Sequence, residues 1–125
     1  MIKYILSLLL CVSFIYAIDI NLTKEEQLYL KKHPVIKAHN EKDWPPFNFN
    51  VNGKPQGFSI DYMNLLASKL GIKVEYVSGY SWKEFMQMVQ TPKLDVIINI
   101  AKNKQRAKTI YFSEPFNTKC YICQY

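Results

Sequence analysis

The sequence predicts an α/β domain in which helices flank a sheet of parallel strands. Two segments with a helical spacing of apolar residues alternate with short apolar segments that are typical of strands. The last short segment, residues 94–100, is almost continuously apolar, as expected of a strand that is covered on both faces. Open sheets of this kind bind ligands at the carboxyl ends of their strands, so the loops after the strands are the candidate site.

The first predicted element is a short helix from Thr23 to Lys32. Thr23 and Glu26 have the three-residue spacing of a capping box, in which each side chain accepts a hydrogen bond from a backbone N–H at the start of the helix. His33 and Pro34 are expected to end it, because proline cannot continue a helix and restricts the residue before it.

A strand at residues 35–38 is predicted to run into Trp44-Pro45-Pro46-Phe47. The two prolines restrict the backbone, so an aromatic ring held here loses little further entropy when it meets a ligand. Residues 47–58 are predicted as a hairpin or loop, with Asn52-Gly53 at its turn and Gly57 at its exit.

The clearest helix is predicted for residues 60–70, and Gly71 supplies its left-handed end. Four residues at the spacing i, i+3, i+4 and i+7 make one apolar face: Met63, Leu66, Ala67 and Leu70. Asp61 lies in the first turn, where a carboxylate suits the helix dipole, so a structural role is expected for it. Residues 72–77 follow as the next strand.

A second helix is predicted from Ser81, which can cap it, to Gln90, and Thr91-Pro92 is expected to end it. Trp82 and Phe85 lie on its apolar face and are predicted to be core residues. The strand at residues 94–100 then completes the sheet. If the three strands are adjacent, the loops that follow them share one rim.

The amino-terminal segment, residues 1–17, has the layout of a secretory signal peptide, with the single cation Lys3 before an apolar run that ends at Ala17. The run is too short to span a bilayer comfortably, since spanning takes about 20 apolar residues. We therefore expect cleavage after Ala17, which leaves residues 18–125 as one small domain. An uncleaved membrane anchor is the alternative, because Ile15 stands where a small residue is preferred.

Charge and metal-ligand spacing argue against several functions. The net charge of +6 is spread over cations interleaved with acids, so no nucleic-acid footprint is indicated. His33 and His39 lack metal-ligand spacing, and we predict neither a metal site nor a cofactor. Cys120 and Cys123 could pair in an oxidising compartment. A redox or zinc role is not favoured, because no second pair completes a zinc site and no helix follows to lower a thiol pKa.

Residues 99–116 include the residue type best suited to holding an anion. The segment leaves the last predicted strand, turns through polar residues and presents Arg106 at the rim. An arginine can hold a carboxylate with two parallel hydrogen bonds, a geometry that lysine cannot match. Backbone N–H groups at the start of a following helical turn would add to the binding. A surface arginine that contacts only water is the alternative.

The order and spacing of several motifs resemble those of the family 3 solute-binding proteins, which are bacterial periplasmic receptors. The resemblance covers residues 22–116 and implies a fold of two lobes that close around amino acids and similar small polar solutes. It also implies a periplasmic location. The motifs are Trp-Pro-Pro-Phe at 44–47, Gly-Phe-Ser-Ile-Asp at 57–61, Leu-Gly at 70–71, Trp82, Asp95, Arg106 and Phe-Ser-Glu-Pro-Phe at 112–116.

The resemblance implies a role for five positions. Trp44 matches the aromatic residue that stacks on the ligand, and Glu41 matches a position that can meet the ligand's side chain. Asn99 and Ala101 fall where relatives offer a side-chain hydroxyl or backbone groups. Arg106 matches the arginine that grips the ligand carboxylate.

Two residues depart from the family pattern, and two features resemble a particular group of proteins within the family. Asn103 and Gln105 stand where threonine and glutamate are usual; asparagine can still cap a turn, but specificity for α-amino acids is left open. The lead-in at residues 22–38 and the eleven-residue interval from Asp95 to Arg106 resemble sensor modules ahead of histidine kinases and diguanylate cyclases. The expected partners are therefore a small, carboxylate-bearing polar solute and either a membrane permease or a sensor kinase or cyclase.

The chain stops at Tyr125, where the family's backbone crosses to the second lobe. The resemblance therefore implies the N-terminal lobe only, a truncated copy that binds weakly or not at all on its own. The alternatives are a gene fragment without function and the binding-like lobe of a periplasmic enzyme, either a dehydratase or a peptidoglycan-cleaving protein. We expect no enzyme, because no nucleophile has a base partner and four acids form no catalytic pair by spacing: Glu41, Asp43, Asp61 and Glu84.

Overall fold

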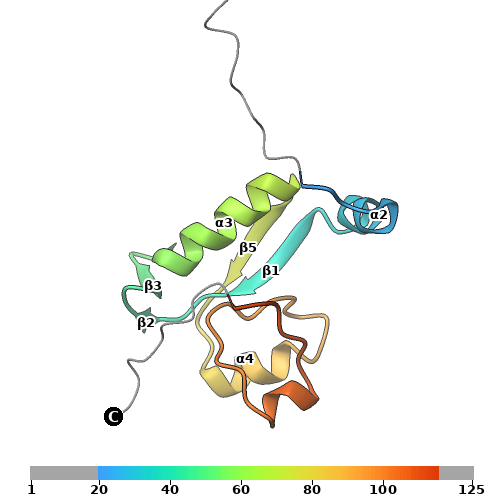
Figure 1. Ribbon diagram of the computed structural model, residues 1–125. Coiled ribbons are helices and arrows are strands. Elements are labelled where there is room, and N and C mark those ends of the chain that lie inside the picture. Colours follow the sequence, from blue (N-terminus) through green and yellow to red (C-terminus); the bar gives the residue numbers. More distant parts are fainter. Residues whose placement is uncertain (1–19, 116–125) are drawn as a thin grey trace, which may run out of the picture.

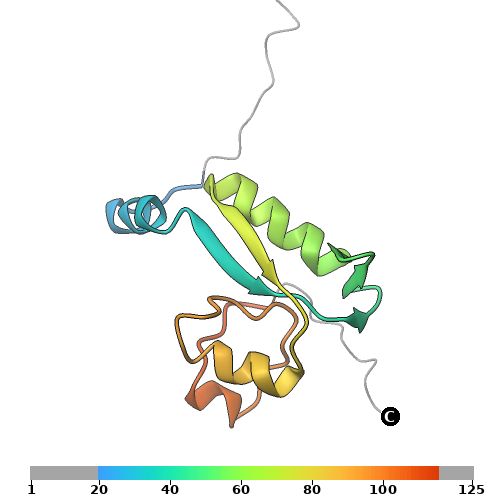
Figure 2. The same ribbon diagram turned by 180° about the vertical axis from the view of Figure 1, so that it is seen from behind.

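The computed structural model describes residues 20–115, so the expectations for the signal segment and for Cys120 and Cys123 lie outside the described residues. In Figures 1 and 2, α3 runs along the strand pair β1 and β5, and this pair lies between α3 and α4. The elements follow in the order α2 (Lys24–Lys32), β1 (Val35–His39), β2 (Asp43–Trp44), β3 (Asn48–Val51), β4 (Lys54–Gln56), α3 (Phe58–Leu70), β5 (Lys73–Val77), α4 (Trp82–Met88) and the 3-10 turn η1 (Arg106–Lys108).

The predicted α/β class with a parallel sheet is confirmed. β1 and β5 pair in parallel, with Val35 opposite Lys73 and His39 opposite Val77. The predicted hairpin is also present, as β3 and β4 of a small antiparallel sheet that includes β2. None of the helices between residues 20 and 115 has the length and apolar character needed to cross a membrane.

A hydrophobic core cluster lies between α3 and the strand pair. Met63 and Ala67 of the predicted apolar face are buried, and Gly71 ends α3 in the left-handed conformation at a φ of 69°. The buried residues Ile60, Met63 and Ile98 form a cluster against half-buried side chains of the strands and the following segment, which are Ile36, Val74, Tyr76 and Val96. Burying apolar area here supplies the main stabilisation of the lobe.

The predicted capping box of α2 forms, the predicted Ser81 cap forms as a second such box with Glu84, and α4 is shorter than predicted. Thr23 caps α2 and Ser81 caps α4 by the same reciprocal bonds to the residue three positions on. α4 ends at Met88, two residues before the predicted end. Phe85 of α4 is fully buried, which confirms its predicted place in the core.

The prediction of a strand at residues 94–100 is wrong in extent. The segment lies beside β1, but only one parallel bridge forms, between Ala38 and Val96. Around it the backbone N–H groups of Asp95 and Val96 share one acceptor, the carbonyl of Lys37, at 2.9 and 3.1 Å. A regular ladder does not continue in either direction.

Side chains take the place of the missing ladder bonds. At one end the Lys37 N–H donates to the carboxylate of Asp95 at 2.8 Å. At the other end the Ile98 N–H donates to Nδ1 of His39 at 3.0 Å. Asn99 then adopts a φ of 61°, a left-handed conformation that turns the chain out of an extended path. The apolar run therefore predicted burial correctly and regular pairing wrongly.

The aromatic loop is fastened to the start of α3. The N–H groups of Phe58 and Ser59 donate to the carbonyls of Pro46 and Phe47, each at 3.0 Å, which satisfies donors that a helix start leaves free. Gly57 permits this approach, since it has a φ of 115° and a Cβ built there would lie 2.4 Å from the Phe47 oxygen.

We predict that Gly57→Ala destabilises the lobe by at least ~2 kcal/mol, because the new Cβ meets backbone atoms and the backbone conformation is one that only glycine adopts readily. Urea unfolding measures the change. Gly53→Ala is the matched control, since Gly53 also has a positive φ but a Cβ there meets nothing within 4 Å. Equal losses in the two variants would show that contact with the aromatic loop is unimportant.

Candidate functional site

A hollow of about 370 Å³ lies where the loops after β1, after β5 and after residue 98 meet. The expectation that these three loops share one rim is therefore confirmed. All five residues proposed from sequence line this hollow, and three further residues join them. The complete lining is Glu41, Asp43, Trp44, Trp82, Asn99, Ile100, Ala101 and Arg106. Contact of the five residues with a ligand stays a prediction.

Arg106 is held in a defined orientation at the start of η1. Its N–H donates to Oδ1 of Asn103 at 2.8 Å, so asparagine does cap this turn in place of threonine. Its side-chain Nη1 donates to the carbonyl of Ala101 at 2.9 Å, and its Cζ lies 5.4 Å from the centre of the Trp82 ring. A guanidinium carries five N–H donors, so one bond to Ala101 does not exhaust its capacity to hold an anion.

Two tryptophans contribute to the lining, and one of them was predicted to be elsewhere. Trp44 is half-buried, with its ring 5.8 Å from that of Phe47. Trp82, predicted as a core residue, is also only half-buried and lines the hollow. Helical spacing groups Trp82 with Phe85, but Trp82 belongs to the first turn of α4. Trp82 directly follows the Ser81 cap, at the rim, and this position could have identified it as a lining residue.

His39 is a buried residue whose position sequence reasoning did not anticipate. Its side chain is fully buried, against the edges of Phe85 at 5.2 Å and Trp82 at 5.9 Å between ring centres. Burial lowers the pKa of His39 to about 4, because a charged imidazole would lose its hydration here. Its Nε2 lies 3.7 Å from Oε1 of Glu41, and partial burial raises the pKa of that carboxyl.

A network of asparagines fixes the backbone beside Glu41. The fully buried Asn40 donates through Nδ2 to Oδ1 of Asn48 at 2.7 Å, and the Glu41 N–H donates to the same oxygen at 3.1 Å. Ser78 and Asn50 both donate to Oδ1 of Asn40. These hydrogen bonds join three segments: the hairpin, the end of β1 and the loop after β5. They restrict the movement of the backbone at the rim of the hollow.

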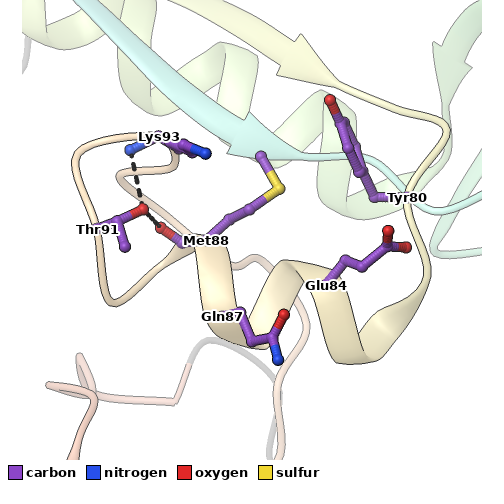
Figure 3. Close-up of a pocket in the computed structure, with 6 residues that line it drawn as sticks. All are labelled: Tyr80, Glu84, Gln87, Met88, Thr91 and Lys93. Atoms are coloured by element: carbon purple, nitrogen blue, oxygen red, sulfur yellow. Dashed lines mark hydrogen bonds between the residues drawn. The ribbon is translucent and has the colours of Figure 1, made fainter.

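A second hollow of about 250 Å³ lies beside α4 and is shown in Figure 3. Its polar groups already serve the local fold: Glu84 accepts from Ser81, Thr91 donates to the carbonyl of Met88, and the Lys93 N–H donates to Thr91. None of the five predicted site residues lines it. Across residues 20–115, no three His, Cys, Asp or Glu side chains gather as metal ligands.

Comparison with known proteins gives one family. The family model for bacterial extracellular solute-binding proteins, family 3, matches residues 36–123. The probable amino-acid-binding protein YxeM of Bacillus subtilis (strain 168) is 33% identical over 72 residues, which make up 57% of this chain and 27% of that protein. A probable amino-acid ABC transporter-binding protein of Haemophilus influenzae is 29% identical over 90 residues, or 70% of this chain and 35% of that protein. The chain thus spans about a third of its curated relatives or less.

Solved structures share the fold. An arginine-bound form of domain 1 from TmArgBP matches with a TM-score of 0.66 and 28% identity, over 76% of this chain and 74% of that one. An ancestral cationic amino acid solute binding protein matches with a TM-score of 0.63 and 32% identity, over 71% of this chain and 39% of that one. An ancestral cyclohexadienyl dehydratase matches with a TM-score of 0.64 and 27% identity, over 78% and 40% respectively.

We predict that His39 makes stability depend on pH between about 4 and 6.5. In this window the unfolded imidazole binds a proton and the folded one does not, so its contribution is complete above pH 6.5 and is lost as the pH falls toward 4. A shift of this size corresponds to about 3 kcal/mol. Urea unfolding of wild type and His39→Asn across this range measures the difference in slope.

The control for this experiment is His33→Asn, because His33 is exposed at the end of α2. Acidic groups distant from His39 also titrate in this range, but their contribution is shared by wild type and both variants. A pH slope that persists unchanged in His39→Asn would contradict the assignment.

Proposed function

Because the chain belongs to the bacterial extracellular solute-binding proteins of family 3, we propose that it binds a small amino-acid-like solute through a carboxylate. The observation that carries the proposal is that one hollow gathers an oriented guanidinium, two tryptophan rings and two carboxylates from three separate loops. Family members are extracellular, and we propose that residues 1–17 serve as the export signal and residues 18–125 as the first lobe.

The chemistry of the lining suits a solute that carries both charges. Arg106 offers parallel N–H donors to a carboxylate, while Glu41 and Asp43 offer negative charge to an ammonium or guanidinium group. Trp44 presents an aromatic surface for the intervening carbon chain. Asn99 and Ala101 add polar groups between them. Relatives named as amino-acid-binding and cationic amino-acid-binding proteins support this class of solute.

We propose that a single lobe carries only part of the affinity. A second lobe would exclude the water that otherwise competes for each hydrogen bond. The arginine-bound form of domain 1 from TmArgBP is a related precedent for a ligand held by such a domain. A relative named as an ABC transporter-binding protein supports a permease as partner. A sensor kinase or cyclase is the other partner that we propose, from the lead-in at residues 22–38.

A dehydratase function is the second candidate, because an ancestral cyclohexadienyl dehydratase shares the fold. The binding function is favoured, since the curated relatives are named as binding proteins. Assay of the chain for dehydration of a cyclohexadienyl substrate separates the two functions, and turnover there would make the binding proposal incomplete.

We predict that Arg106→Ala weakens binding of L-arginine by about 2 to 5 kcal/mol, because the carboxylate loses its charged partner. Calorimetric titration with L-arginine and with agmatine, which lacks the carboxylate, measures it. Wild type should prefer L-arginine, and the variant should bind both equally weakly. Lys104→Ala is the control, because Lys104 is exposed and does not line the hollow. A preference for L-arginine that survives in Arg106→Ala would refute the carboxylate assignment.

We predict that Trp44→Ala lowers the affinity for the same solute about tenfold, whereas Trp44→Phe retains most of it, because phenylalanine keeps an aromatic surface. The same calorimetric titration provides the measurement. Similar losses in both variants would show that the indole N–H, and not the aromatic surface, is what the solute needs.

A further inference from the structure

The hydrogen bond between Ile98 and His39 fixes the tautomer of the buried imidazole. The backbone N–H of Ile98 can only donate, so Nδ1 of His39 at 3.0 Å must be the acceptor and carries no proton. A neutral imidazole keeps one proton, which therefore lies on Nε2. His39 thus presents a fixed N–H donor on the side opposite Ile98.

This Nε2 donor has no hydrogen-bond partner although it is buried. A buried donor without a partner is unfavourable, so an acceptor close by is expected to be drawn to it. Oε1 of Glu41 lies 3.7 Å away, just beyond hydrogen-bond distance, on a side chain that is 21% exposed. A movement of well under 1 Å by the Glu41 carboxylate would complete the bond.

The surroundings leave Glu41 as the charged group that His39 faces most closely. From α4, the contacts of His39 are the uncharged rings of Trp82 and Phe85. Glu84, also on α4, is engaged by the Ser81 cap. Two other charged residues line the hollow with Glu41, namely Asp43 and Arg106. A donor next to Glu41 therefore acts on its carboxylate in a partly desolvated place, where such interactions are strong.

We infer that His39 is a positioning residue for the solute site, which holds Ile98 through Nδ1 and keeps the Glu41 carboxylate ionised and directed into the hollow through Nε2–H. Burial works in the opposite direction, since it raises the pKa of Glu41. The donor from His39 offsets that effect. The negative charge that Glu41 adds to the lining is thereby maintained, which favours solutes with a cationic group. This inference rests on the proposed function, but its test needs no solute.

Two substitutions of His39 test the roles of its two ring nitrogens separately. His39→Asn places an amide oxygen near the position of Nδ1 and can still accept from Ile98, but it removes the donor near Glu41. His39→Gln extends one bond further, so its amide can reach toward Glu41 while the acceptor for Ile98 is lost. NMR titration of carbon-13-labelled glutamate in the full chain reads the pKa of Glu41, with Glu41→Gln to assign the signal. The amide signal of Ile98 reports on the first bond.

We expect the pKa of Glu41 to rise by about one unit in His39→Asn, with a little-changed Ile98 amide. In His39→Gln the pKa should stay within a few tenths of wild type, and the Ile98 amide should shift and exchange faster. An unchanged Glu41 pKa in His39→Asn, or equal shifts in both variants, would overturn the inference. If His39→Asn does not fold, His39→Leu, which also removes the donor, takes its place: a raised Glu41 pKa supports the inference and a wild-type one overturns it.

Failure of this inference can be distinguished from failure of the proposed function. If Arg106→Ala leaves solute binding unchanged but the Glu41 titration behaves as expected, the carboxylate assignment is wrong while the role of His39 stands. If Arg106→Ala behaves as expected and the titration does not, the solute site stands without the contribution of His39.

Discussion

The hydrogen bond from Ile98 to the buried imidazole of His39 is the contact on which the candidate site depends most. It joins the end of β1 to Ile98, two residues beyond Val96, whose carbonyl accepts a backbone hydrogen bond from the His39 N–H. Directly beyond it Asn99 turns out of the extended path, and the carbonyl of Ala101 becomes available to Arg106. The orientation of the guanidinium therefore traces back, through a few residues, to one side chain of the neighbouring strand.

Local sequence signals correctly predicted those features of the fold that depend on neighbouring residues alone, such as the ends of helices. Thr23 with Glu26 marked the start of α2, Ser81 marked the start of α4, and Gly71 marked the end of α3, because each acts within one turn of its own helix. The segment at residues 94–100 was a different case. Part of its backbone pairing is replaced by side-chain bonds with Lys37 and His39, which lie 58 and 59 residues away in the chain. An apolar run reports burial but cannot reveal that a distant side chain will take the place of a backbone partner.

The location of the candidate site could be predicted better than the full set of residues that form it. Parallel strands bring their carboxyl ends together, so the meeting of three loops followed from topology, and family resemblance supplied five of the eight residues that line the hollow. Trp82 was assigned to the core because it shares the helical spacing of Phe85. That spacing does not show that Trp82 lies in the first turn of α4, beside the hollow. The asparagines at positions 40, 48 and 50 were missed because no short-range rule predicts which amides will meet across a hairpin.

α2 differs from α3 and α4 in having no buried residue. Its nine residues are held by a capping box and by charges that suit the helix dipole, and so short a helix is only marginally stable by itself in water. Loss of α2 would expose no core. The lobe is therefore expected to behave as two cooperative units of unequal strength, in which α2 opens and closes on its own many times for each global unfolding event.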